Sequence, residues 1–271
     1  MWSATPELKK IGYLLHLSQH EIHVAAQYNI VPDLHVEDYV FNALYSHSYA
    51  KEFDKAFDAY CQSGRVSAVN IADIINRHLK PSRSAHPITF LDFASGYGCV
   101  SRHFRNVFPG SPVVAMDIHD HAFYFNKGHL KIDAAISHTD PANVAIFSRF
   151  DVVFALSFFS HMPRATQLPW LDKLTEFVKP GGLLIFTTHG ETSHKKHMPH
   201  IVVDGDGYGF IAESEQFDLS TSDYGHAVTY KNFTLEMINQ LGGVNLVEFR
   251  EAFWWTHQDT YVLRKQAIIS R

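Results

Sequence analysis

The chain has little cysteine, no dense run of basic residues and no long hydrophobic stretch. Its two cysteines, Cys61 and Cys99, are too few for a disulfide framework or a cysteine-rich zinc site. Lysine and arginine total 23 against 28 acidic residues, so the net charge of −5 argues against a nucleic-acid backbone as the main partner. The longest mainly apolar run, Val152–Phe159, is too short to cross a bilayer. The first ten residues lack an export-signal pattern, so we expect a cytoplasmic protein without a membrane partner.

Histidine and aromatic residues are abundant. There are 19 histidines, and 14% of the residues are aromatic, a composition that suits either a metal site or a polar and aromatic pocket. Three histidines, His194, His197 and His200, have a three-residue spacing that would bring them together on a helix. No acidic or cysteine pattern accompanies them, so we predict no metal site and metal-independent chemistry.

The first 85 residues read as a helical N-terminal lobe. Thr5, Pro6 and Glu7 form a helix-start signal, with a capping oxygen, an early proline and an early acid. Two groups of apolar residues have helical spacing: Phe53, Ala56, Phe57 and Tyr60, and then Ile71, Ile74, Ile75 and Leu79. Lys80–Pro87 reads as a linker to a second domain, which we expect over residues 86–271.

Short apolar runs alternate with helical patterns in this second domain. The strand candidates are Ile88–Phe93, Pro112–Asp117, Ala134–His138, Asp151–Ser157 and Leu183–Thr188. Such alternation predicts an α/β fold with a doubly wound, mostly parallel, seven-stranded sheet. A helix over Thr234–Leu241 and two strands joined by a short turn complete it, the last strand being antiparallel. The polar, irregular residues 190–232 are too long for a simple connection, so we expect a substrate-covering insertion there.

The stretch "ITFLDFASGYG" ends a strand on a glycine-rich turn that leads into a helix. Glycine lets the backbone approach a ligand closely, and a helix N-terminus favours an anionic group. A dinucleotide site needs G-x-G-x-x-G, and with Gly96 and Gly98 as the first two glycines the third position is Ser101. A nicotinamide-dependent oxidoreductase is therefore a weaker alternative, but it stays open.

The same stretch resembles motif I of class I S-adenosylmethionine-dependent methyltransferases, (D/E)-x-G-x-G-x-G. Asp92, Gly96 and Gly98 match it, and Ala94 replaces the first glycine. Further matches follow in order: "VVAMDIH", then "FDVVFALSFFSHMP", which resembles motif IV, then "LTEFVKPGGLLIFTT" with its Lys-Pro-Gly-Gly turn. The resemblance covers Ile88 to Lys265 and implies S-adenosylmethionine as the cofactor.

The resemblance also implies the residues that contact this cofactor. Asp92 would lie near the methionyl ammonium, Asp117 would accept both ribose hydroxyls, and Asp140 would lie beside the adenine amino group. The full set is Asp92, Ala94, Ser95, Gly96, Gly98, Asp117, Ile118, Asp140 and Ser157. Each has a plainer reading as a turn, cap or strand-end residue.

A hydroxyl acceptor needs a base at the carboxyl ends of the strands. His161 follows the fourth strand and His189 follows the fifth, so both are candidate catalytic residues. The alternative reading of His161 is a helix-start residue. Tyr208, Tyr224 and His226 are candidates to line an acceptor pocket, and an aromatic lid of this kind suits a neutral, aromatic or sugar acceptor. The alternative is that these aromatic side chains fill a local core.

Some acceptor classes lack their usual sequence features here. "SFFS" replaces the (D/N/S)-P-P-(Y/F/W) pattern of amino-group methylases, and no Pro-Cys follows the fourth strand. Ala155-Leu156-Ser157 carries no acid of the kind that metal-dependent catechol enzymes place there. We therefore predict O-methylation of a small-molecule or glycan acceptor. A non-catalytic cofactor-binding regulator is the alternative of another class, and a homodimer is compatible with the sequence.

Overall fold

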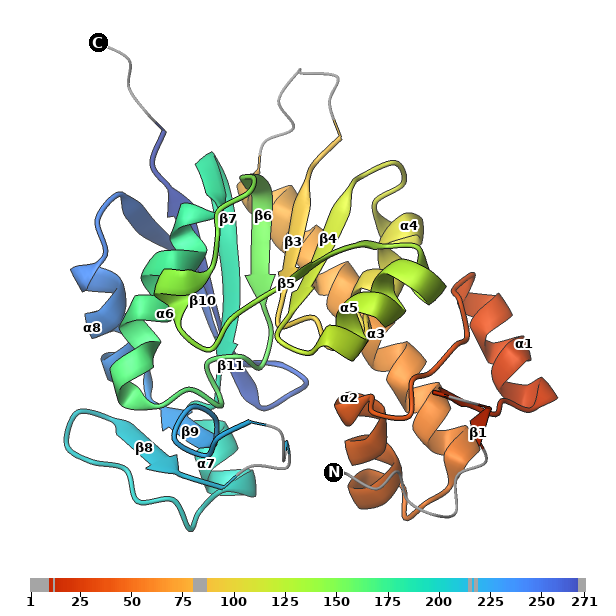
Figure 1. Ribbon diagram of the computed structural model, residues 1–271. Helices are drawn as coiled ribbons and strands as arrows, with labels where there is room; N and C mark the ends of the chain where they lie inside the picture. Colours follow the sequence, from red (N-terminus) through yellow and green to blue (C-terminus); the bar gives the residue numbers. More distant parts are fainter. Residues whose placement is uncertain (1–9, 12, 80–86, 214–215, 217–218, 268–271) are drawn as a thin grey trace. The chain divides into compact units, whose positions relative to one another are not determined.

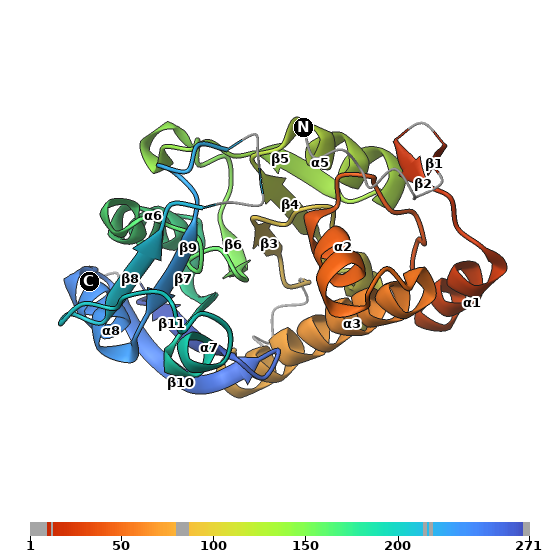
Figure 2. The ribbon, with the colours of Figure 1, turned by 90° about the horizontal axis from the view of Figure 1, so that it is seen from below.

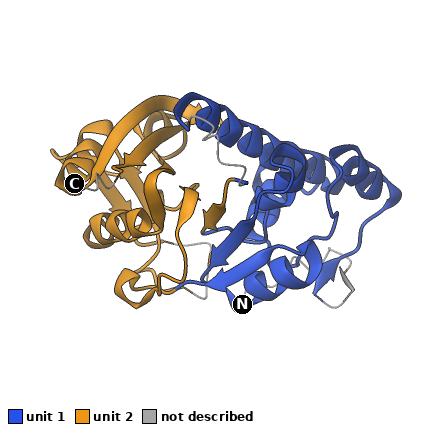
Figure 3. Cartoon of the chain, turned by 90° about the horizontal axis from the view of Figure 1, so that it is seen from above, with its two compact units in different colours: residues 1–87, 94–137 blue, residues 88–93, 138–271 orange. Residues whose placement is uncertain are grey.

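The computed structural model describes residues 10–11, 13–79, 87–213, 216 and 219–267. The chain divides into two compact units (Figure 3), unit 1 with residues 1–87 and 94–137 and unit 2 with residues 88–93 and 138–271. Unit 1 thus joins the N-terminal region to the glycine turn and to the two strands that follow it. The expected helix start at Thr5–Glu7 and most of the linker lie outside the described residues.

Unit 1 begins with a small strand pair and four helical segments. Ser18 and Glu21 form a capping box at the start of the first long helix, which fixes where that helix begins. The early elements are β1 (Lys10–Ile11), β2 (Leu14–Leu15), α1 (Gln19–Tyr28), α2 (Tyr39–Ala43), the π-helix η1 (Leu44–Ser48) and α3 (Phe53–His78). The later ones are η2 (Ser101–His103), α4 (Phe104–Val107), β4 (Val113–Asp117), α5 (Asp120–Phe125), η3 (Asn126–Leu130) and β5 (Asp133–Ile136).

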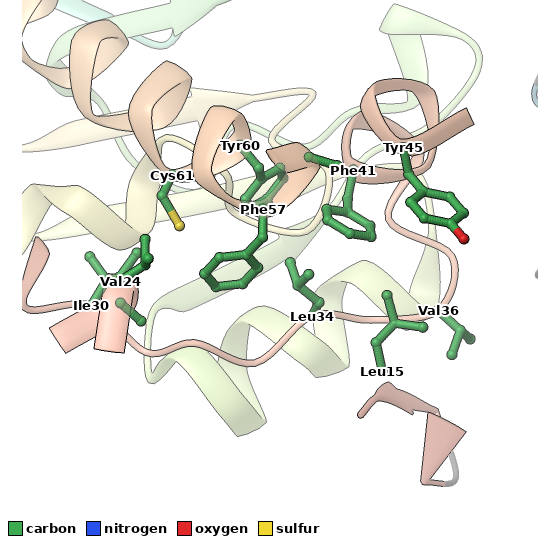
Figure 4. Packing of buried hydrophobic residues seen from close by; sticks show 12 residues of the cluster. Leu15, Val24, Ile30, Leu34, Val36, Phe41, Tyr45, Phe57, Tyr60 and Cys61 are labelled. Carbon is green, nitrogen blue, oxygen red and sulfur yellow. The ribbon is translucent and has the colours of Figure 1, made fainter. Parts of the chain in front are cut away.

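The predicted apolar face of α3 is confirmed. Ala56, Phe57 and Tyr60 are fully buried in a cluster with Leu34 and Phe41 (Figure 4), while Phe53 is only partly buried against it. The second predicted group is also buried at Ile71, Ile74 and Ile75. Burial of an aromatic or aliphatic side chain of this size contributes about 1.5–3 kcal/mol, so this face accounts for much of the stability of the N-terminal helices.

Unit 2 holds most of the remaining strands. They alternate with helices in the order β3 (Phe90–Phe93), η4 (Pro141–Asn143), β6 (Phe150–Ala155), α6 (Arg164–Glu176), β7 (Val178–Thr188), α7 (Glu191–His197), β8 (Tyr208–Ile211), β9 (His226–Thr229), α8 (Lys231–Gln240), β10 (Val244–Trp254) and β11 (Gln258–Lys265). The central strands β3 and β6 are almost wholly buried, as their continuous apolar sequences predict.

The sheet has seven strands in the order β10-β11-β7-β6-β3-β4-β5 (Figure 1). β6 pairs in parallel with β3 and with β7, and β4 pairs in parallel with β5. β11 is antiparallel to both β7 and β10. The predicted fold class, a mostly parallel seven-stranded sheet with an antiparallel last strand and N-terminal helices, is confirmed.

Two local expectations need correction. The predicted turn at Lys179–Gly182 interrupts no strand: β7 starts before it, and its register with β6 shifts there, with Gly181 at φ +82°. Residues 190–232 are not irregular throughout, because they contain α7 and the antiparallel pair β8–β9 (Figure 2). The polar sequences of these residues do not predict the strands, because β8 and β9 form hydrogen bonds with each other and with residues that are distant in the sequence.

In the part of the chain that the structure describes, no helix combines the length and the apolar character needed to span a bilayer.

Candidate functional site

The glycine turn lies in unit 1 and is held in an unusual conformation. Ala94, Gly96 and Gly98 all have positive φ, at 56°, 51° and 72°. A Cβ at Gly98 would come within 2.4 Å of Asn126 Oδ1, whereas a Cβ at Gly96 would meet no atom within 4 Å. The turn is thus packed on one side and open on the other. An open backbone surface of this kind fits close approach by a ligand, and the predicted cofactor is compatible with it.

Asp117 ends β4 and connects to this turn through hydrogen bonds. Its Oδ2 accepts the backbone N–H of Gly96 at 2.7 Å, and its Oδ1 accepts both the backbone N–H and Nδ1 of His119, at 3.1 and 2.7 Å. Ser95 N–H donates to the carbonyl of Met116, which fastens the turn to the same strand. With two bonds on Oδ1 and one on Oδ2, this carboxylate keeps room for one further donor on Oδ2. Ile118 follows and is half-buried.

Replacing Asp117 by asparagine tests the cofactor reading. We expect Asp117→Asn to weaken binding of S-adenosylhomocysteine about 10- to 100-fold, because hydrogen bonds to a charged group contribute about 1.5–3 kcal/mol. Isothermal titration calorimetry measures this, and Asp120→Asn, which changes an exposed acid in the first turn of α5, is the matched control. Equal affinity in wild type and Asp117→Asn would remove Asp117 from the cofactor site.

Two predicted cofactor residues of unit 2 differ in burial. Asp92 lies in β3 and is 4% exposed. Asp140 is exposed, and its Oδ1 accepts the N–H of Ala142, so it caps the short helix η4. This capping is the plainer of the two readings of Asp140 and leaves its adenine contact as a prediction.

A cluster of histidine and tyrosine rings gathers in unit 2 where β6 and β7 end. His161 stacks on Tyr224 at 4.4 Å with an interplanar angle of 6°. The ring of His226 is 5.8 Å from that of His161, and the ring of His189 is 6.3 Å from it. His257 lies 5.7 Å from His189. The structure thus brings together four of the five predicted catalytic and acceptor residues.

Ser157, Thr187, Gln258 and His189 form a hydrogen-bond relay behind this cluster. Ser157 N–H donates to Thr187 Oγ1, so the Thr187 hydroxyl donates to Gln258 Oε1 at 2.6 Å. This fixes the orientation of the Gln258 amide, whose Nε2 donates to Ser157 Oγ at 3.0 Å and to His189 Nε2 at 3.1 Å. Ser157 has φ of 58°, and its polar atoms are held inside this relay.

His189 is a neutral imidazole whose lone pair is already in use. Because Gln258 Nε2 can only donate, His189 Nε2 accepts and the proton lies on Nδ1. Burial lowers the pKa of His189 well below its ordinary value, and the neighbouring His161, His257 and His226 lower it further. Burial also lowers the pKa of His257 to about 4, with His197 and Lys196 adding to the effect. His189 is therefore better placed to orient its neighbours than to take up a proton.

His161 has the same tautomer but a different partner. Its Nδ1 lies 2.8 Å from the carbonyl oxygen of Gly225, which can only accept, so the proton is on Nδ1 and the lone pair is on Nε2. Gly225 is itself fixed by its N–H bond to the carbonyl of His161. In this tautomer one nitrogen is anchored and Nε2 is the basic nitrogen, as a general base requires.

β9 and the residue before it are tethered to the loops that carry these histidines. Gly225, Ala227 and Thr229 donate their N–H groups to the carbonyls of His161, Ser160 and His189. Tyr208, on the partner strand β8, is 6% exposed and donates its hydroxyl to the carbonyl of Met162. Tyr208 is therefore a buried structural contact in this arrangement, apart from the ring cluster.

Sequence reasoning missed Thr187 and Gln258. Gln258 is the first residue of the last strand, and the strand sequence QDTYVLRK has other polar residues, so nothing local singles Gln258 out. Its contacts with Ser157 and His189 span 101 and 69 positions, so no local pattern reveals them.

The fold agrees with the comparisons to known proteins. Residues 91–184 match the family model described as "Methyltransferase domain". The match spans 94 of the 271 residues. The match covers β3, β4, β5 and β6, the glycine turn, Asp117 and His161. No curated protein matches this chain.

Solved structures share the fold at low identity. DesVI from Streptomyces venezuelae has a TM-score of 0.55 and 14% identity, covering 84% of this chain and 97% of that one. A S-adenosylmethionine-dependent methyltransferase from Clostridium acetobutylicum has a TM-score of 0.53 and 14% identity, covering 82% and 98%. CalS10, an amino pentose methyltransferase from Micromonospora echinaspora described with bound S-adenosylmethionine, has a TM-score of 0.53 and 14% identity, covering 75% and 92%. These structures share the fold of this chain.

Proposed function

We propose that this protein transfers a methyl group from S-adenosylmethionine to a hydroxyl oxygen of a small-molecule or sugar-containing acceptor. The observation that carries the hydroxyl assignment is the tautomer of His161, with Nδ1 anchored to the Gly225 carbonyl and the lone pair on Nε2. The methyltransferase domain and the open glycine turn support the cofactor.

The cofactor supplies an electrophilic methyl group when it is bound, so the protein residues position the acceptor and remove its proton. In this proposal His161 Nε2 would accept the hydroxyl proton as the acceptor oxygen takes the methyl group, whose bond to the donor sulfur breaks to release S-adenosylhomocysteine. The proton then resides on the imidazolium, which Gly225 stabilises by accepting from Nδ1. His189 and Gln258 hold the loop of Ser157 in place.

The surroundings of His161 favour an uncharged acceptor. Tyr224 stacks on its ring, and His189 and His257 are kept neutral by burial, so the cluster offers flat rings with few charges. Flat rings bind aromatic or sugar rings through stacking. We propose such an acceptor in the cytoplasm, without a nucleic-acid or membrane partner. The amino pentose acceptor of CalS10 makes sugars a sensible part of the test panel.

Cofactor choice separates this proposal from the oxidoreductase alternative. We expect S-adenosylhomocysteine to bind with a dissociation constant on the order of 1–100 µM, a range common among enzyme ligands, and NADH to bind far more weakly. Isothermal titration calorimetry with the two ligands in the same buffer measures both. Tight NADH binding without S-adenosylhomocysteine binding would overturn the proposal.

Turnover distinguishes the proposed methyltransferase from a non-catalytic cofactor-binding regulator. The assay follows labelled methyl groups from S-adenosylmethionine into a panel of phenols, sugars and amino sugars. Transfer to a hydroxylated acceptor supports the proposal. Transfer only to amines would make nitrogen, and not oxygen, the methylated atom. Cofactor binding with no transfer across the panel favours the regulator.

A further inference from the structure

A second cluster of ligand-type side chains lies in unit 1, outside the ring cluster described above. His35 and Glu37 belong to the segment between α1 and α2, and His121 is the second residue of α5. One ligand atom of each lies within 4.8 Å of the other two. His35 and His121 are 86 positions apart in the sequence, so no spacing pattern predicts their meeting.

We infer that His35, Glu37 and His121 form a zinc site that cross-links the segment before α2 to helix α5. Two imidazoles and one carboxylate are a ligand set that zinc uses, with a fourth position left for water. Nitrogen ligands disfavour calcium and magnesium, which prefer oxygen. The inference does not rest on the proposed methyl transfer, and the metal has no part in that chemistry.

The ligand groups are oriented before any ion binds. His121 Nδ1 lies 2.8 Å from Glu37 Oε2, which also accepts the hydroxyl of Tyr97 at 3.1 Å. The ring of His35 stacks on Tyr97 at 4.6 Å and lies 5.8 Å from the ring of His121. These contacts fix the carboxylate and both rings, so coordination needs only a small separation of His121 from Glu37.

The ligand groups differ in their access to solvent. His35 is only 5% exposed. The side chains of His121 and Glu37 are 55% and 39% exposed, which gives an ion access from solvent.

Coordination has one identifiable cost. Glu37 N–H donates to His35 Nδ1 at 3.1 Å, and a metal at either nitrogen of His35 would disturb this bond. The loss concerns one neutral hydrogen bond, which three metal–ligand bonds outweigh.

The test uses the full chain, stripped of metal with a chelator that is then removed. Zinc is titrated against a chromophoric chelator, and cobalt replaces it to read visible d–d absorption. We expect one ion per chain, and Glu37→Gln and His121→Ala to weaken binding more than about 100-fold, because even partners outside the first ligand shell contribute 10–100-fold. Both changed residues are partly exposed, so both variants should fold.

His129→Ala is the matched control. His129 belongs to the same unit and also pairs with a carboxylate, its Nδ1 lying 3.0 Å from Asp33 Oδ2, but among the described residues no third ligand joins that pair. We expect His129→Ala to bind zinc and cobalt like the wild type. Absence of stoichiometric binding, or binding that survives both Glu37→Gln and His121→Ala, would overturn the inference, the latter outcome showing adventitious surface binding only.

Discussion

His161→Gln should lower the turnover number about 10²- to 10⁴-fold, the range that a positioned general base contributes. The affinity for S-adenosylhomocysteine should change little, because His161 is assigned to the acceptor and not to the cofactor. The physical reason is that glutamine retains a donor for the Gly225 carbonyl but offers no basic nitrogen at the position of Nε2. Initial rates with labelled methyl donor and the best acceptor of the panel measure the loss.

A matched variant gives an independent check on this role. His200→Ala, which removes an exposed histidine of the same unit, is the control and should keep the wild-type rate. A His161→Gln enzyme that retains its rate would show that positioning alone is enough for transfer, or that the base is another residue.

Much of the fold was predictable because burial dictates sequence locally. Strands covered on both faces must be continuously apolar, and such runs predicted β3, β4 and β6 to within a few residues. The last strand was predicted over the same residues that form β11, Gln258–Lys265. The glycine turn was equally visible, since positive φ and close packing demand small residues there.

The structure within residues 190–232 was not predictable in the same way. β9 is short and half polar, and its position depends on backbone bonds such as Thr229 N–H to the His189 carbonyl, 40 positions away. The residues that flank Thr229 in the sequence do not indicate such a bond. The three aromatic candidates there separated for the same reason: Tyr224 and His226 approach His161, whereas Tyr208 turns to the carbonyl of Met162.

The candidate site was predictable by residue type but not by role. The end of a strand marks His161 and His189 alike, and only their partners distinguish them. Both histidines carry the proton on Nδ1, but His161 Nδ1 donates to the Gly225 carbonyl, whereas His189 Nε2 accepts from the Gln258 amide. The two roles thus depend on Gly225 and Gln258, which local patterns did not single out.

Arg102→Met should be the most destabilising single change in unit 1, with a loss of about 3–5 kcal/mol in the free energy of unfolding, the cost of breaking a buried charged network. Arg102 is 4% exposed, and its guanidinium donates to five groups. The acceptors are the carbonyls of Val31, Asp33, Tyr97 and Gly98 and the hydroxyl of Tyr60. Arg102 therefore ties the glycine turn to the segment after α1 and to α3.

The loss of unfolding free energy arises from the buried polar groups that Arg102→Met leaves without their cationic partner. Tyr60 donates its hydroxyl to Asp38 Oδ2 at 2.6 Å, and burial raises the pKa of that carboxyl while the charge of Arg102 opposes the rise. Methionine fills similar volume but leaves the carbonyls and the Asp38 carboxyl buried without the cation. Urea unfolding followed by circular dichroism measures the loss, with exposed Arg105→Met on α4 as the control. Arg102→Met and the control could unfold at the same urea concentration. That result would show that the guanidinium contributes no net stability and that the apolar cluster around Phe57 stabilises this part of the chain by itself.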